Sequence, residues 1–193
     1  MSDAARLPLP DVPRLVRRAR EGGAYDDGST AMRSPLERYT TLYRALEQLA
    51  RFNDKDVEQT LAVGFACGRS KEIGQALQSF ARQVAGLSPA WLGFLVDEKI
   101  EGAARDAAAA SLRSTAKGLS AGKFYPKDER ICRDATRLLR GLRNAAVHAK
   151  VMTTDRNTGQ VFGVACVLLD ELVVASYQGC FLLGEDEVAA AMG

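Results

Sequence analysis

Residues 34–51 read SPLERYTTLYRALEQLAR, and this stretch decides the fold class. Ser34 can cap a helix, Pro35 suits the first helical position, and Glu37 completes a capping box. Apolar residues then recur every three or four positions along one side of the helix: Leu36, Tyr39, Leu42, Tyr43, Leu46 and Leu49. The stretch therefore predicts an amphipathic helix whose apolar side packs in a core.

Further helix-start signals follow at Asn53-Asp54, Ser70 and Ser88-Pro89. The alanine-rich stretch 103–110 continues the last of these helices or begins another. Short links favour antiparallel neighbours, so we predict an all-α, antiparallel bundle of five or six helices over residues 34–185. We expect residues 1–33 to form a basic N-terminal arm with one short helix, and residues 186–193 to form a frayed acidic tail.

Residues 161–183 have a pattern that supports two structures. Valines are dense in this segment, which favours a strand. Apolar residues nevertheless keep helical spacing at Val161, Val164, Leu168 and Leu172, and the segment exceeds ordinary strand length. We interpret it as a helix, with a strand as the alternative.

The composition indicates a water-soluble, cytoplasmic protein. Of the 193 residues, 47% are hydrophobic and 26% are charged, which are ordinary globular values. The N-terminus lacks the apolar segment of a secretion signal, and the longest apolar run, 161–169, is too short to cross a membrane. Four scattered cysteines and one histidine do not match a zinc or disulfide framework, so we predict neither metal nor cofactor.

Positive charge gathers in the segment from Lys127 to Lys150, whose pattern is helical. The net charge of the chain is only +2, but 19 of its 26 basic residues are arginines, whose planar guanidinium suits forked contacts with phosphate. The segment holds seven basic residues against three acidic ones. We therefore expect it to be the electropositive face of the bundle.

The only histidine of the chain, His148, lies near the end of this basic segment. On a helix, Asn144 shares the face of His148, whereas Arg143 is turned away from it by about 140°. Val147 is apolar but lies off the predicted core side, where the helix of a monomer would meet water. A second copy packed by two-fold symmetry would cover Val147 and bring an arginine near a histidine. We therefore predict a homodimer through residues 127–150.

Arg143, Asn144 and His148 together resemble the motif of the HEPN superfamily, in which arginine and histidine are separated by four to six residues, often with a polar residue after the arginine. Residues 39–47 also resemble the first core helix of some HEPN proteins. The resemblance implies a HEPN-like bundle that cleaves RNA as a dimer without a metal ion. It also implies that His148 deprotonates a ribose 2′-hydroxyl, that Arg143 stabilises charge on the phosphate, and that Asn144 orients His148 or the phosphate.

RNA is therefore the expected ligand of the basic segment. The predicted RNA-binding residues are Arg130, Arg133, Arg137, Arg140 and Lys150. A toxin or an anti-phage defence component would fit this activity, with an antitoxin or a ribonucleoprotein as protein partner and no membrane. Some nucleolytic HEPN toxins carry a tyrosine two places after the histidine, where this chain has Lys150.

Two other hypotheses remain open. A non-catalytic, all-helical RNA-binding subunit of a ribonucleoprotein complex, similar to the small subunits of CRISPR effectors, would use the arginines and leave His148 dispensable. A protein adaptor would use Val147 as a docking point and the basic helix as a solvated face. Other enzyme classes are disfavoured, because the chain has no glycine-rich phosphate loop and no G-x-S-x-G motif.

Overall fold

The computed structural model confirms the all-α fold class that the sequence predicts. It describes residues 11–21, 23, 24, 30, 31, 34–97, 99–125, 128–147 and 156–192. The helices of these segments are α1 (Val12–Arg20), α2 (Pro35–Phe52), α3 (Val57–Cys67), α4 (Ser70–Ala85), α5 (Pro89–Leu95), α6 (Gly102–Ala121), α7 (Glu129–Val147), α8 (Arg156–Phe181) and α9 (Glu185–Met192). A two-residue antiparallel pair, β1 (Gly23–Ala24) with β2 (Thr30–Ala31), is the only sheet in this part of the chain.

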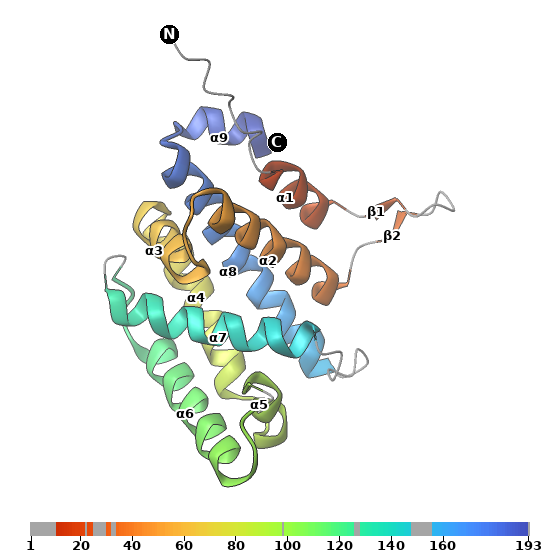
Figure 1. Cartoon of the computed structure of the whole chain (residues 1–193), viewed down its shortest axis with the longest axis vertical. Helices are drawn as coiled ribbons and strands as arrows, with labels where there is room; N and C mark the ends of the chain where they lie inside the picture. The colour runs from red at the N-terminus through yellow and green to blue at the C-terminus, as the bar shows by residue number, and fades with distance from the viewer. Residues whose placement is uncertain are drawn as a thin grey trace.

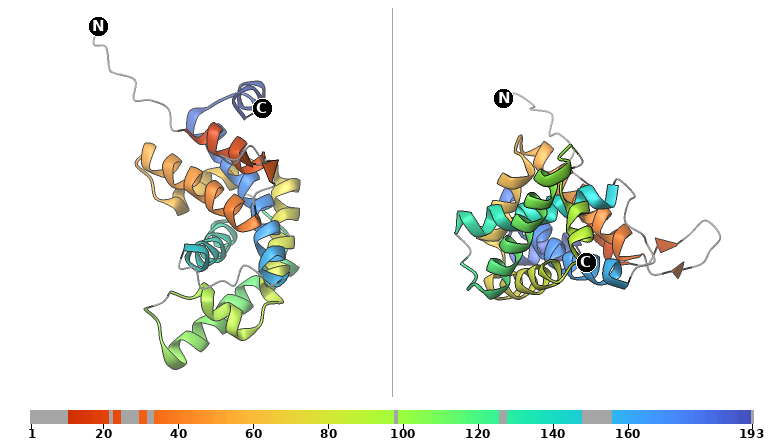
Figure 2. Two further views of the ribbon diagram at one scale, coloured as in Figure 1. Left: turned by 90° about the vertical axis from the view of Figure 1, so that its right-hand side faces the viewer. Right: turned by 90° about the horizontal axis from the view of Figure 1, so that it is seen from below.

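The helices stack along one long axis of the molecule. Figures 1 and 2 show α1 and α9 at one end of this axis and α5 and α6 at the other. Between the two ends, α7 runs across the bundle and contacts both α2 and α6 (Figure 1). The basic helix therefore lies at the middle of the molecule.

Seven helices, α2 to α8, lie in the described part of the segment 34–185, where the sequence predicts five or six. One reason is a break between α5 and α6, which makes the alanine-rich stretch 103–110 part of a separate helix. Gly102, the first residue of α6, has a φ of +56°, in the left-handed region that favours glycine. The chain turns there, and α6 packs back against α5.

Two helix starts show how well local signals locate the elements. The predicted capping box of α2 is formed: the Ser34 hydroxyl accepts from the Glu37 amide at 3.2 Å, and the Ser34 amide donates to the Glu37 carboxylate at 3.0 Å. The start of α3 is two residues later than predicted. Asp54 has a φ of +51° in the link, and Asp56 caps the helix by accepting from the Gln59 amide at 2.7 Å.

The segment predicted at 161–183 is a helix, α8, and the strand alternative is wrong. This helix packs against α2, α3 and α4 and supplies the middle of the core. Its approach to α3 is close, because the Ser176 hydroxyl donates to the Thr60 carbonyl at 2.9 Å. A Cβ at Gly64 would lie 2.7 Å from the Leu172 carbonyl oxygen, so the contact requires glycine there.

Helix α8 is also long and apolar. Its stretch Gly159–Phe181 has the length and composition of a helix that could cross a membrane. In the most apolar 18 residues of this stretch, 56% is buried among the other helices. Core helices of water-soluble proteins pass the same test, so this finding is weak evidence for a membrane segment.

The C-terminal end of the chain is a helix, α9, and the prediction of a frayed tail is wrong. Three acidic residues in its first turn, Glu185, Asp186 and Glu187, favour the positive end of the helix dipole. Val188 and Met192 are buried, and α9 contacts α1 and α8. The burial of these two side chains explains why the end of the chain is ordered.

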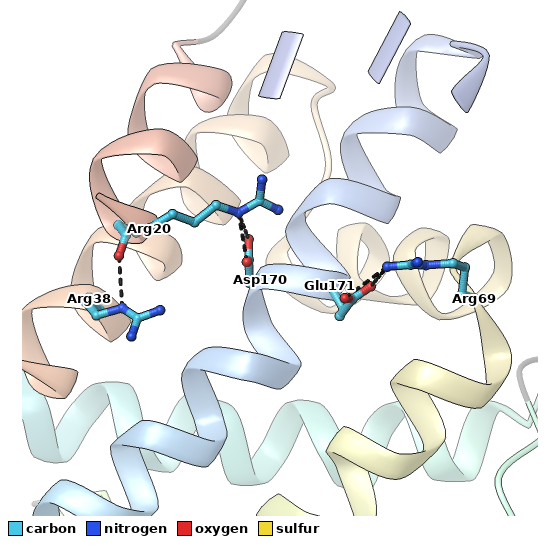
Figure 3. A network of polar contacts seen from close by, with 6 residues as sticks. Arg20, Arg38, Arg69, Asp170 and Glu171 are labelled. Atoms are coloured by element: carbon cyan, nitrogen blue, oxygen red, sulfur yellow. Dashed lines mark hydrogen bonds and ion pairs between the residues drawn. The ribbon is translucent and has the colours of Figure 1, made fainter. Parts of the chain in front are cut away.

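The helix predicted within the N-terminal arm is α1, which packs on the bundle through Val12, Val16 and Ala19. Two arginines hold it in place (Figure 3). Arg20 binds Asp170 of α8 with an Nε to oxygen distance of 2.9 Å, and Arg38 of α2 donates to the Ala19 carbonyl at 2.9 Å. The second bond pairs a carbonyl that the end of α1 leaves without a helical partner.

Candidate functional site

Helix α7 forms the predicted basic helix and separates its apolar and basic residues. Its buried side chains face the core: Cys132, Ala135, Thr136, Leu138, Leu139, Leu142 and Ala145. The arginines occupy the remaining surface of the helix. Lys127 and residues 148–150 of the predicted helix lie outside the described residues.

A cleft of about 650 Å³ lies between α7, α2 and the start of α3. One wall belongs to α7 and consists of Arg133, Thr136, Arg137, Arg140, Arg143 and Asn144. The facing wall consists of Tyr43 and Glu47 from α2 and Asp56, Val57 and Glu58 from α3. We call this the α7 cleft. It presents four guanidinium groups on one side and three carboxylates on the other.

The α7 cleft brings together five of the eight predicted site residues. Arg143 and Asn144 line it with Arg133, Arg137 and Arg140. The other three do not line the cleft or cannot be placed. Arg130 is among them: its side chain is 82% exposed and lies 3.9 Å from Asp134, one turn further along the same helix. His148 and Lys150 fall outside the described residues.

Arg143 is held by a carboxylate that the sequence did not identify. Its Nη2 lies 3.1 Å from Oε1 of Glu47, and both side chains are about one third exposed, at 34% and 28%. Glu47 follows Tyr39 and Tyr43 at four-residue steps, so the three share one face of α2. That spacing was the available signal, but an acid beside an apolar stripe is normally solvated.

Two buried tyrosines of α2, Tyr39 and Tyr43, lie on the same helix face as Glu47. The Tyr39 hydroxyl donates to the Leu139 carbonyl at 2.6 Å, and the Tyr39 side chain is completely buried. Burial raises the pKa of Tyr39 well above its ordinary value, so the phenol remains a donor. For Tyr43, burial and then the charge of Glu47 raise the pKa, whereas Arg143 lowers it. A neutral phenol therefore lines the cleft on the wall that faces α7.

The C-terminal end of α7 exposes an apolar side chain. Val147 is 52% exposed, as expected for a residue off the core side of the helix. It lies three residues after Asn144, which lines the cleft, and directly before His148 in the sequence. The predicted two-fold contact at this point stays a prediction.

Other arginines serve the fold. Arg105 donates from Nη2 to the Gly93 carbonyl at 2.8 Å, and Arg113 donates from Nη2 to the Leu87 carbonyl at 2.6 Å. These carbonyls belong to the last turn of α5 and to the segment after α4. The Gly93 carbonyl also accepts from the Val96 amide at 3.4 Å. Carbonyls at helix ends are incompletely paired by the helix itself, and a guanidinium satisfies them well. The number of arginines in the sequence therefore overstates the number available for phosphate.

The cysteines do not form a site in the described residues. Cys132 and Cys166 are buried, and burial raises their pKa to about 11 and about 12, so these thiols stay protonated. Cys67 is exposed, and Cys180 is partly buried. In the segments that the structure describes, no three His, Cys, Asp or Glu side chains gather closely enough to hold a metal ion.

No protein-family model matches the chain, and no curated protein or solved structure matches it either. The resemblance of Arg143, Asn144 and His148 to the HEPN motif therefore stays a prediction from the sequence. The geometry of the α7 cleft is the independent observation that bears on function.

Proposed function

We propose that the protein is a metal-independent endoribonuclease of the HEPN type that acts as a homodimer, as a toxin or an anti-phage defence component. The observation that carries the proposal is the row of arginines along one wall of the α7 cleft: Arg133, Arg137, Arg140 and Arg143. On a helix that rises about 1.5 Å per residue, these ten residue steps extend roughly 15 Å. A row of this length can contact consecutive phosphates of one strand.

The mixed charge of the cleft favours single-stranded RNA. Guanidinium groups on the α7 wall attract phosphate, whereas Glu47, Asp56 and Glu58 on the facing wall repel it. Carboxylates can instead accept hydrogen bonds from the amino groups of bases, as in contacts to cytosine. A strand that lies with its phosphates toward α7 and its bases toward α3 satisfies both walls. Unstacked bases in single-stranded RNA are free to make such contacts.

The proposed reaction uses the residues at the C-terminal end of the arginine row. His148 accepts the proton of a ribose 2′-hydroxyl, and the 2′-oxygen attacks the adjacent phosphorus atom. The bond from phosphorus to the 5′-oxygen then breaks, and that oxygen takes up a proton. Arg143 stabilises the negative charge that develops on the phosphate, and Asn144 orients His148 or the phosphate. The products carry a 2′,3′-cyclic phosphate and a 5′-hydroxyl, respectively.

The homodimer is proposed from the positions of Val147 and Arg143. Arg143 lies in the cleft beside Glu47. Positions five apart on a continuous helix differ by about 140°, so the spacing alone would not bring Arg143 and His148 of one protomer together. The exposed Val147 gives a second copy an apolar contact beside the proposed site. In such a dimer, Arg143 of one protomer and His148 of its partner would act on one phosphate.

The test is cleavage of a single-stranded RNA by the purified protein in the presence of EDTA. We expect His148→Ala to abolish cleavage while the circular dichroism spectrum and the Tm stay unchanged. The matched control is Arg69→Ala, which removes an arginine from an ion pair outside the cleft. Cleavage that survives in His148→Ala, or no cleavage by the wild type, would contradict the proposal.

A second candidate is a non-catalytic RNA-binding subunit, because the arginine row can hold phosphates without His148. In that case the wild type binds RNA without cleaving it, and His148→Ala binds equally well. Each alanine substitution at Arg133, Arg137 or Arg140 should then reduce the slope of log K against log salt by about 0.7. The same RNA-binding titrations distinguish this candidate from the nuclease.

A further inference from the structure

We infer that Glu47 is a positioning residue that holds the guanidinium of Arg143 in its working orientation and opposes tight binding of the RNA phosphate. The inference rests on the proposed function, because it assigns a role within the same site. It starts from the 3.1 Å contact between Glu47 Oε1 and Arg143 Nη2 at the edge of the α7 cleft.

Glu47 engages only part of the guanidinium. Arg143 has five N–H donors in a fixed plane, and the carboxylate contacts the group through Nη2. Among the described residues, Arg143 has no other hydrogen-bond acceptor. Within the described residues, the donors of Nε and Nη1 are therefore left for a phosphate oxygen while Glu47 holds Nη2.

The position of Glu47 is fixed by the packing beneath it. Tyr39, Tyr43 and Glu47 lie on one face of α2, and the hydrogen bond from Tyr39 to the Leu139 carbonyl anchors that face on α7. Because Tyr39 and Tyr43 are buried, α2 cannot rotate without breaking core contacts. The carboxylate of Glu47 is thus presented to Arg143 by a rigid element, as a positioning residue requires.

The same carboxylate has an electrostatic cost for binding. A phosphate that contacts Arg143 also approaches the negative charge of Glu47, so the charge weakens ground-state binding. Orientation of the guanidinium, by contrast, matters most when charge develops on the phosphate in the transition state. Removal of the Glu47 charge should therefore tighten RNA binding and slow cleavage, two effects in opposite directions.

The experiment compares Glu47→Gln and Glu47→Ala with the wild type in two measurements. Single-turnover cleavage of an RNA oligonucleotide reports the chemical step, and the Kd for the same oligonucleotide with 2′-deoxyribose at the cleavage site reports binding alone. We expect both variants to bind about threefold more tightly. We expect cleavage to slow about tenfold in Glu47→Ala and less in Glu47→Gln, whose amide oxygen still accepts from Arg143.

The matched control is Glu171→Gln on α8. Glu171 pairs with Arg69 at 3.1 Å, and its side chain is 31% exposed, close to the value for Glu47. The substitution thus removes the same charge from a similar ion pair outside the α7 cleft, and neither the cleavage rate nor the Kd should change. Equal changes of cleavage rate and Kd in Glu47→Gln and Glu171→Gln would mean that Glu47 has no specific role in the site.

The outcomes separate this inference from the proposed function. If the wild type cleaves and His148→Ala does not, but Glu47→Ala cleaves at the wild-type rate, only the role of Glu47 is overturned. Weaker binding together with slower cleavage in both Glu47 variants also overturns it, because that result indicates a structural role. A wild type that cleaves no RNA overturns both. Should Glu47→Ala fail to fold, the opposite changes in binding and rate must appear in Glu47→Gln.

Discussion

The ion pairs Arg143–Glu47 and Arg69–Glu171 have the same length, 3.1 Å, but lie in different surroundings. Arg143 is two thirds covered and is one of four arginines along a cleft, whereas the Arg69 side chain is 66% exposed and joins the link before α4 to α8 (Figure 3). The bond alone does not distinguish them. The neighbouring charges and the depth of burial indicate that Arg143 can act on a ligand and that Arg69 holds two helices together.

The strongest test of this comparison is the pair of variants Arg143→Ala and Arg69→Ala. Loss of a group that stabilises a transition-state charge costs about 100-fold to 1,000-fold in rate, so we expect at least a 100-fold loss of RNA cleavage in Arg143→Ala. Arg69→Ala should cleave within twofold of the wild type. Similar rates for the two variants would remove the distinction between the cleft and the exposed pair.

A smaller effect is expected for Tyr39→Phe, which removes the anchor between α2 and α7. The lost hydrogen bond to the Leu139 carbonyl should lower the free energy of unfolding by about 1 kcal/mol, measured by urea denaturation. Tyr177→Phe is the control, since Tyr177 is buried but its hydroxyl makes no hydrogen bond within the described residues. If both variants lose the same stability, the Tyr39 bond does not anchor the helices.

The smallest effect on stability is expected for the partly exposed ion pairs that join helices, which Figure 3 shows. Asp170→Asn removes the charge that binds Arg20, and both side chains are partly exposed. Such pairs contribute roughly 0–1 kcal/mol, so urea denaturation should show a change below about 1 kcal/mol, which shrinks further in high salt. A larger loss, independent of salt, would show that α1 depends on this contact for its place in the bundle.

Local sequence signals were sufficient for most of the fold. The capping box at Ser34 and the apolar spacing of residues 161–183 predicted α2 and α8 because both signals act within a few residues of the chain. The helix α9 was missed because its order depends on distant contacts, through Val188 and Met192. No local sequence pattern predicts that a short acidic segment will bury its apolar side chains against distant helices.

The candidate site shows the same division between local and distant information. The spacing of Arg133, Arg137, Arg140 and Arg143 predicts that they occupy a broad surface of one helix, and the cleft confirms that they gather. Glu47 was missed because it lies 96 positions from its partner. The packing of α2 against α7 brings the two together, and the hydrogen bond from the buried Tyr39 to the Leu139 carbonyl joins the two helices.

The order of the helices along the chain has a consequence for biosynthesis. Helix α8 fills the middle of the core, yet it is translated after its three main partners, α2, α3 and α4. Until α8 emerges from the ribosome, the apolar surfaces of α2, α3 and α4 that α8 covers in the folded protein stay exposed. Nascent chains that stop before residue 156 would therefore expose apolar surface and be prone to aggregation or to binding by chaperones.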